Sequence, residues 1–271
     1  MSGPALERAD RKVKPFCISE EEVRNAYERV KANKGAGGVE EQSIAAFAAF
    51  AERLRQNLYK IWNRMSSGSY FPPVVKPKAN GEQRKSSTQT VSDRIAQMVV
   101  KARLERDFES LTRVNAYGFR SGKSASEAVG PARKPRRSDR IVALDIRGFL
   151  DNLDQNMLMR TVKQHTKEKW IVLYMERWLR ASLKKEDVWL AIRDGEVTPL
   201  LSALLLHCAF DRWIAATYPH AQCKRSADDV ILYCRTEIEA EEIRTAIAAH
   251  LKERQLAVHP SRAPQRFRDT A

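Results

Sequence analysis

The chain has 271 residues, and its 48 lysines and arginines against 34 aspartates and glutamates give a net charge of +14. This length can bury one substantial α+β core arranged as two lobes. The charge favours a nucleic-acid partner, because basic residues attract phosphates and release counterions, although a simply basic soluble protein has the same composition. No apolar run approaches the roughly 20 residues that cross a bilayer, and the first residues lack a signal-peptide core. We therefore expect a cytoplasmic protein with no membrane partner.

The first half of the chain predicts helices. Ser19 and Glu22 have the spacing of a capping box, which opens a helix that ends near a glycine-rich turn. Apolar residues recur at helical spacing over residues 43–65, and Gly68 and the prolines after it stop that helix. A further helix is predicted over residues 92–111.

The second half predicts a mixture of strands and helices. In order they are a strand at 141–144, helices at about 155–180 and 199–217, two hairpin strands near 224–227 and 230–234, a helix at about 237–254 and a short strand near 256–259. Thr198 and Pro199 read as a cap and first-turn proline, and Thr236 with Glu239 as a second capping box. This order suits a split βαβ sheet covered by helices on one face, which would bring Asp145 beside Asp228.

Three aspartates carry the strongest chemical signal. Asp145 closes the apolar strand, and the adjacent Asp228 and Asp229 lie at the hairpin turn. An isolated Asp-Asp pair is usually a solvated turn, but burying one between two strands is costly without a cation. Two Mg²⁺ ions roughly 3.5–4 Å apart need hard carboxylate oxygens from separate segments, as in nucleotidyl transfer.

Several longer segments together resemble the reverse transcriptases encoded by bacterial group II introns. They cover about residues 33 to 263 and are 33–36, 57–73, 93–101, 117–125, 144–149, 199–201, 227–229 and 256–260. The resemblance implies an α+β fold of reverse-transcriptase fingers and palm, in which the palm is a split βαβ antiparallel sheet covered by helices. It divides the chain into an N-terminal extension (1–32), fingers (33–139) and palm (140–271), with no thumb helices after the palm.

The same resemblance implies an RNA-directed DNA polymerase that adds deoxynucleotides to a primer on an RNA template, with Mg²⁺ as cofactor and intron RNA as a further partner. Asp145, Asp228 and Ile146 are the implied metal contacts, and Asp229 supports the catalytic site. The implied nucleotide contacts are Lys76, Arg84, Ile146 and Leu150, where Arg84 follows the hairpin turn Asn80-Gly81.

A basic run precedes the Asp145 strand and is a candidate RNA contact, although a solvated loop is an equal reading. Its members are Arg133, Lys134, Arg136 and Arg137.

Departures from the family pattern bear on activity. Ser226 stands where the family has a tyrosine, and Leu150 where an aromatic residue usually screens the sugar 2′ position. The family's Pro-Gln-Gly-Gly loop reads Ile-Arg-Asp-Gly over residues 192–195, so an obligate cation replaces a neutral glutamine. The sequence therefore leaves two hypotheses: an impaired reverse transcriptase, or a catalytically inactive truncated remnant that binds structured RNA.

The four cysteines contain no C-x-x-C pair, and the histidines add no ligand cluster, so we expect no zinc site. Cys223 and Cys234 are placed to face each other across the hairpin. In a reducing cytoplasm they are better read as small hydrophobic residues.

Overall fold

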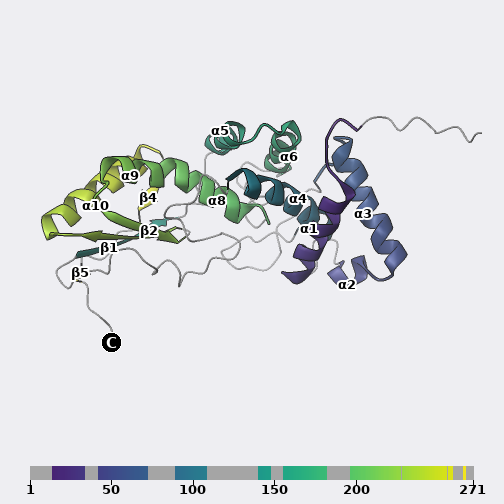
Figure 1. Ribbon diagram of the computed structural model, residues 1–271, viewed down its shortest axis with the longest axis horizontal. Helices are drawn as coiled ribbons and strands as arrows, with labels where there is room; N and C mark the ends of the chain where they lie inside the picture. The colour runs from purple at the N-terminus through teal and green to yellow at the C-terminus, as the bar shows by residue number, and fades with distance from the viewer. Residues whose placement is uncertain are drawn as a thin grey trace, which may run out of the picture.

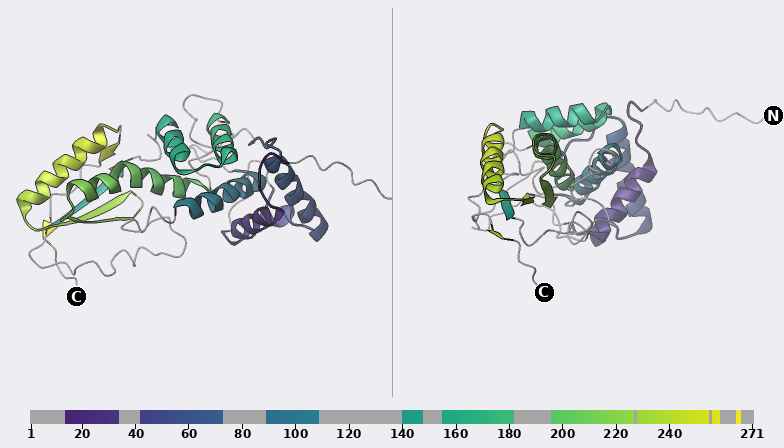
Figure 2. Two further views of the ribbon diagram at one scale, coloured as in Figure 1. Left: turned by 45° about the horizontal axis from the view of Figure 1, so that its top comes forward. Right: turned by 60° about the vertical axis from the view of Figure 1, so that its left-hand side comes forward.

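The structure is a computed structural model, and it describes residues 14–33, 42–72, 89–108, 140–147, 155–181, 196–226, 228–254, 256–258 and 265–266. Figure 1 shows the strands at one end of the molecule with α9 and α10 along one face of the sheet. Helices α1, α2 and α3 lie at the opposite end, and α4 and α8 run between the two ends (Figures 1 and 2).

The first half of the chain contributes four of the helices described. They are α1 (Glu20–Ala32), α2 (Ile44–Phe47), α3 (Ala51–Ser66) and α4 (Val91–Phe108). The second half contributes α5 (Gln155–His165), α6 (Lys169–Arg180), α8 (Thr198–Leu206), the π-helical segment η2 (His207–Asp211), α9 (Arg212–Thr217) and α10 (Glu237–Lys252).

Both predicted capping boxes are confirmed. The Ser19 hydroxyl accepts a hydrogen bond from the Glu22 amide at 3.1 Å, and the Glu22 carboxylate accepts one from the Ser19 amide at 2.9 Å. Thr236 and Glu239 make the same reciprocal pair at the start of α10. Each box satisfies amide groups that a helix start otherwise leaves unpaired, and each contributes about 1 kcal/mol.

The single helix predicted over residues 43–65 is wrong, because α2 and α3 are separate. The Phe47 ring is buried against Tyr27, with ring centroids 6.2 Å apart. The Asn57 side chain donates to the Phe47 carbonyl at 3.0 Å and so satisfies an acceptor at the end of α2. At the other end of α3, Gly68 has φ of 74° and stops the helix as predicted.

The helix predicted over 155–180 is likewise two helices, α5 and α6. The chain turns at Thr166, whose hydroxyl accepts a hydrogen bond from the Glu168 amide at 3.2 Å. Such local side-chain bonds compete with helix continuation without needing proline or glycine.

The helix predicted at 199–217 continues unbroken from Thr198 to Thr217 through α8, η2 and α9. Thr198 is its first residue and not its cap, since Val197 occupies the cap position. Contrary to our expectation, this stretch is long and apolar enough by composition to cross a membrane. More than half of it is buried inside the fold, and Leu200 to Leu206 are all buried, so core packing accounts for its apolar character.

The sheet is antiparallel, with strand order β2-β3-β1-β4 and β5 paired to β1. Its strands are β1 (Arg140–Arg147), β2 (Gln222–Ser226), β3 (Asp229–Cys234), β4 (Ala257–Val258) and β5 (Gln265–Arg266). The strand, helix and hairpin order expected for the sheet is confirmed, and α10 packs against β1, β3 and β4.

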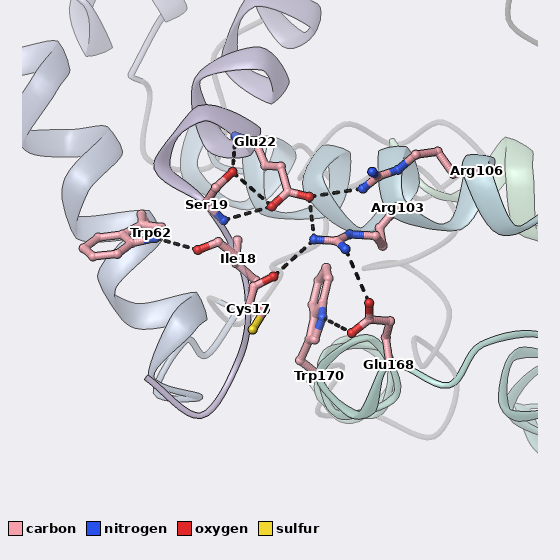
Figure 3. Close-up of polar contacts among 9 residues, drawn as sticks. All are labelled: Cys17, Ile18, Ser19, Glu22, Trp62, Arg103, Arg106, Glu168 and Trp170. Carbon is pink, nitrogen blue, oxygen red and sulfur yellow. Dashed lines mark hydrogen bonds and ion pairs between the residues drawn. The ribbon is translucent and has the colours of Figure 1, made fainter. Parts of the chain in front are cut away.

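A polar junction ties the first half of the chain to the second. Arg103 of α4 donates to Glu22 of α1 at 2.6 Å, to Glu168 before α6 at 3.4 Å and to the Cys17 carbonyl at 3.1 Å (Figure 3). Arg106 adds a second contact to Glu22 at 3.2 Å. Because one guanidinium binds three segments, α1, α4 and α6 hold a fixed mutual orientation.

Candidate active site

Strands β1 and β3 bring the three aspartates to the same end of the sheet. Asp145 lies directly opposite Asp229 in the antiparallel register. The Ile146 amide donates a hydrogen bond to the Asp228 carbonyl oxygen at 3.1 Å. Opposite residues in such a pair have Cβ atoms about 4.5–5.5 Å apart. The expectation that Asp145 would lie beside the aspartate pair is therefore confirmed.

Asp145 and Asp229 project from the face of the sheet that α10 does not cover, here called the open face. On β1 the alternate residues Val142, Leu144 and Ile146 are buried, so Asp145 points the other way. The same alternation on β3 leaves Asp229 exposed, and Asp228 in the adjoining turn is also exposed.

The open face forms rows of residues that lie side by side across three strands. Ser226 on β2 lies opposite Asp229, which lies opposite Asp145. The next row holds Lys224, Ile231 and Ala143, and the third holds Gln222, Tyr233 and Ile141. The carboxylate row is thus followed by rows in which β1 and β3 supply apolar and aromatic residues and β2 supplies Lys224 and Gln222.

Like charge accumulates at the carboxylate row. Partial burial raises the pKa of Asp229, and the neighbouring carboxylates of Asp228 and Asp145 raise it further. A raised pKa of this origin means that the site gains from a nearby positive charge, which would favour the ionised form.

The donor chemistry fits a hard divalent cation, which binds carboxylate oxygens. Within the described ranges, however, no group of three or more His, Cys, Asp or Glu side chains is gathered closely enough to hold a metal ion. The three carboxylates are neighbours in register without converging on one point. The Ile146 side chain is buried, so any contact from this residue to a metal or nucleotide has to come from its main chain.

The remaining residues predicted from the sequence fall outside the described part of the chain. They are Lys76, Arg84, Leu150 and the basic residues Arg133, Lys134, Arg136 and Arg137, together with the turn at 80–81 and the loop at 192–195. Ser226 is described only in its backbone, which pairs with Asp229.

Arg225 is a buried residue behind the candidate site that the sequence analysis missed. Its side chain points to the covered face of the sheet and is 1% exposed. Its Nε donates to Asp211 Oδ1 at 2.8 Å, and its Nη2 donates to Asp211 Oδ2 at 2.6 Å. Burial pushes the pKa of Asp211 upward, but hydrogen bonds from Arg225 and His207 outweigh burial and hold that pKa below its ordinary value. This pair anchors β2, the strand that leads into Asp228, to the helix behind it.

The π-helical segment η2 carries Asp211 and is braced from α10. His250 lies 2.8 Å, through its Nε2, from the Ala209 carbonyl oxygen, and its ring stacks on Trp213 with centroids 3.8 Å apart. A π-helical turn leaves i→i−4 bonds unmade and often marks functional sites. In η2 the Ala209 carbonyl oxygen has His250, 41 residues away in sequence, as a hydrogen-bond partner.

Comparison with known families agrees with this geometry. Residues 76–263 match the family described as reverse transcriptase (RNA-dependent DNA polymerase). The match covers more than half of the chain and includes all three aspartates. The chain therefore belongs to the reverse transcriptase family, whose members are RNA-directed DNA polymerases that bind RNA templates and primers and use divalent metals.

Individual relatives are intron-encoded proteins. The chain is 24% identical over 195 residues to the group II intron-encoded protein LtrA of Lactococcus lactis subsp. cremoris, covering 67% of this chain and 32% of that protein. It is 23% identical over 168 residues to the putative COX1/OXI3 intron 1 protein of Saccharomyces cerevisiae, covering 58% of this chain and 20% of that protein. The matched region spans about a third or less of the length of these relatives.

Proposed function

We propose that this chain contains the nucleotide-adding site of a group II intron-type reverse transcriptase, with Asp145 and Asp228 as metal ligands and Asp229 as their support. The observation that carries the proposal is the register of Asp145 opposite Asp229 on the open face. Two-metal chemistry needs carboxylates from separate chain segments, and the placement of Asp145 and Asp229 side by side on two strands supports the proposal.

The reaction is the attack of a primer 3′ hydroxyl on the α-phosphate of a deoxynucleoside triphosphate, which forms a phosphodiester bond, breaks the bond between the α- and β-phosphates and releases pyrophosphate. Bound Mg²⁺ would supply electrostatic stabilisation of the attacking and leaving oxygens. The protein groups orient the reactants: Arg84 and Lys76 contact the triphosphate, and Ile146 and Leu150 border the incoming nucleotide. In this proposal residues 33–139 form fingers and 140–271 form the palm.

RNA is the proposed template, and the residues Arg133, Lys134, Arg136 and Arg137 are proposed to contact its phosphates. The net charge of +14 supports an anionic partner. The two named relatives are intron-encoded, so intron RNA is the proposed further partner.

Activity is proposed to be lower than is typical of the family, because Ser226 and the Ile-Arg-Asp-Gly loop at 192–195 alter the surroundings of the aspartates. A second candidate function is RNA binding without polymerisation. The same departures favour this function. So does the finding that, among the described residues, the neighbouring carboxylates are not gathered closely enough to hold a metal ion.

Primer extension on an annealed RNA template separates the two candidates. The polymerase proposal expects extension that requires a divalent metal and stops when a chelator is added. Retained RNA binding, with folding confirmed by circular dichroism and no extension at any Mg²⁺ concentration, would leave the RNA-binding function in its place.

A further inference from the structure

Phe71 is a large aromatic residue held in an exposed position. Its side chain follows the turn that ends α3, and the residue is 69% exposed. Single exposed apolar residues are common on protein surfaces and need no explanation. Phe71 differs because its surroundings fix the ring in place.

A guanidinium lies against the ring and is itself fixed. The Arg177 guanidinium carbon is 4.0 Å from the Phe71 ring centroid. Arg177 Nη1 donates to the Gly68 carbonyl at 2.7 Å and to the Tyr70 carbonyl at 2.6 Å. The cation therefore clamps the turn on either side and supports one side of the aromatic ring.

The turn is anchored to the core at a further point. The Tyr70 hydroxyl donates to buried Asp93 at 2.9 Å, and Tyr174 donates to the Met65 carbonyl at 2.5 Å. Because the backbone on which Phe71 stands is tied to α4 and α6, presenting the ring costs little conformational entropy on binding.

We propose that Phe71 is a stacking platform for an unpaired nucleobase of RNA bound to this protein. The proposal rests on the proposed RNA partner and adds a contact far along the chain from the aspartates. An exposed ring supported by a guanidinium on one side can stack with a base of any identity, since every base has a π-face. Arg180, exposed one helical turn beyond Arg177, is positioned to meet the adjoining phosphate.

The chain offers a matched control in Phe50. Phe50 is 72% exposed and precedes α3, whereas Phe71 follows it. Among the described residues, Phe50 makes no ring-ring or cation-ring contact. Phe50→Ala therefore removes the same side chain, at the same exposure, without removing a supported platform.

The test is fluorescence anisotropy of a short unpaired RNA labelled with fluorescein. Stacking of one base contributes about 1–3 kcal/mol, so Phe71→Ala is expected to weaken affinity by about fivefold to about 150-fold. Phe71→Trp should keep or improve wild-type affinity, and Phe50→Ala should leave it unchanged. The salt dependence of binding should not change in Phe71→Ala, because no charge is lost.

An abasic version of the same RNA makes the test specific for stacking. Wild type and Phe71→Ala should bind the abasic RNA equally, because the base that distinguishes them is gone. A loss in Phe71→Ala that persists on abasic RNA, or is matched by Phe50→Ala, overturns the platform. Normal binding by Phe71→Ala overturns it too while leaving the RNA partner intact, whereas failure of the wild type to bind RNA overturns both.

Discussion

Arg225 and Asp211 form a buried two-point ion pair that joins strand β2 to the helix behind the sheet, with N–O distances of 2.8 and 2.6 Å. β2 leads directly into Asp228 and Asp229. The pair therefore helps to fix the turn that carries these two aspartates relative to the core, although neither Arg225 nor Asp211 lies on the open face.

Breaking this pair should destabilise the protein strongly. Arg225→Met leaves Asp211 as a buried carboxylate without its main partner, a change that typically costs about 3–5 kcal/mol. Arg225→Met combined with Asp211→Leu should cost less than the sum of the two single changes, because neither charge remains. Urea unfolding followed by circular dichroism measures all three variants, and strict additivity would contradict a direct pair.

Asp93 should make the free energy of unfolding fall as pH rises. Burial raises its pKa to about 6 from an ordinary value of 3.8, against the opposing effect of hydrogen bonds from Trp178, Tyr70 and Gln97. The folded protein therefore holds this proton more tightly than the unfolded chain. The resulting stabilisation is fully present below about pH 4 and is lost as pH rises through about 6, with a size of about 3 kcal/mol.

Asp93→Asn isolates this contribution, because other carboxylates such as Asp211 shift stability in the opposite direction. An asparagine keeps an oxygen for the Trp178 and Tyr70 donors and carries no titratable proton. The difference in unfolding free energy between wild type and Asp93→Asn should change across pH 4 to 6 and be flat above pH 7. A difference independent of pH over this range contradicts a raised pKa.

A side chain at Gly68 should destabilise the protein. Its φ of 74° is unfavourable for other residues, and an added Cβ would lie 3.0 Å from the Phe16 ring. Gly68→Ala is expected to lower stability by about 1–2 kcal/mol. In a Phe16→Leu background, Gly68→Ala should lower stability by less, because the close contact with the ring is removed. Part of the loss should remain, because the backbone strain at this φ remains. Thermal unfolding of wild type, Gly68→Ala, Phe16→Leu and the double variant measures these costs. A Gly68→Ala variant as stable as wild type would contradict the prediction.

The sequence correctly predicted those helix ends that are fixed by residues a few positions away in the chain. The two capping boxes were predicted from pairs of residues three positions apart, and the stop at Gly68 was predicted from the glycine and the prolines that follow it. The strand predicted at 141–144 lies within β1, but β1 continues to Arg147, so Asp145 lies inside the strand and not at its carboxyl end.

Elements whose ends depend on distant contacts were not predicted. Residues 45–49 are good helix formers, and the break after Phe47 arises because Asn57 and Tyr27 bind it there. The burial of Arg225 was missed because arginine is usually exposed, and its partner Asp211 lies on a different element. Alternation counted back from the aspartate turn would have placed Arg225 on the covered face with Cys223.

Restoring the family residue at position 226 should raise activity. Ser226 pairs with Asp229 at the edge of the carboxylate row, so Ser226→Tyr would place an aromatic ring beside the proposed primer end. Single-turnover extension of a pre-annealed primer should be faster in Ser226→Tyr than in wild type, because positioning supplies much of such catalysis. Equal rates in the two proteins would show that this departure does not limit the reaction.

The most direct test of the proposed site is the rate of metal-dependent primer extension in Asp145→Asn and Asp228→Asn. Each change removes one proposed ligand charge, which should cost several kcal/mol of transition-state stabilisation and lower the rate by at least about a thousandfold. Glu242→Gln, which removes an exposed charge from α10, is the control and should keep the wild-type rate. If either aspartate variant extended the primer at the wild-type rate, the assignment of these carboxylates as the catalytic site would be contradicted.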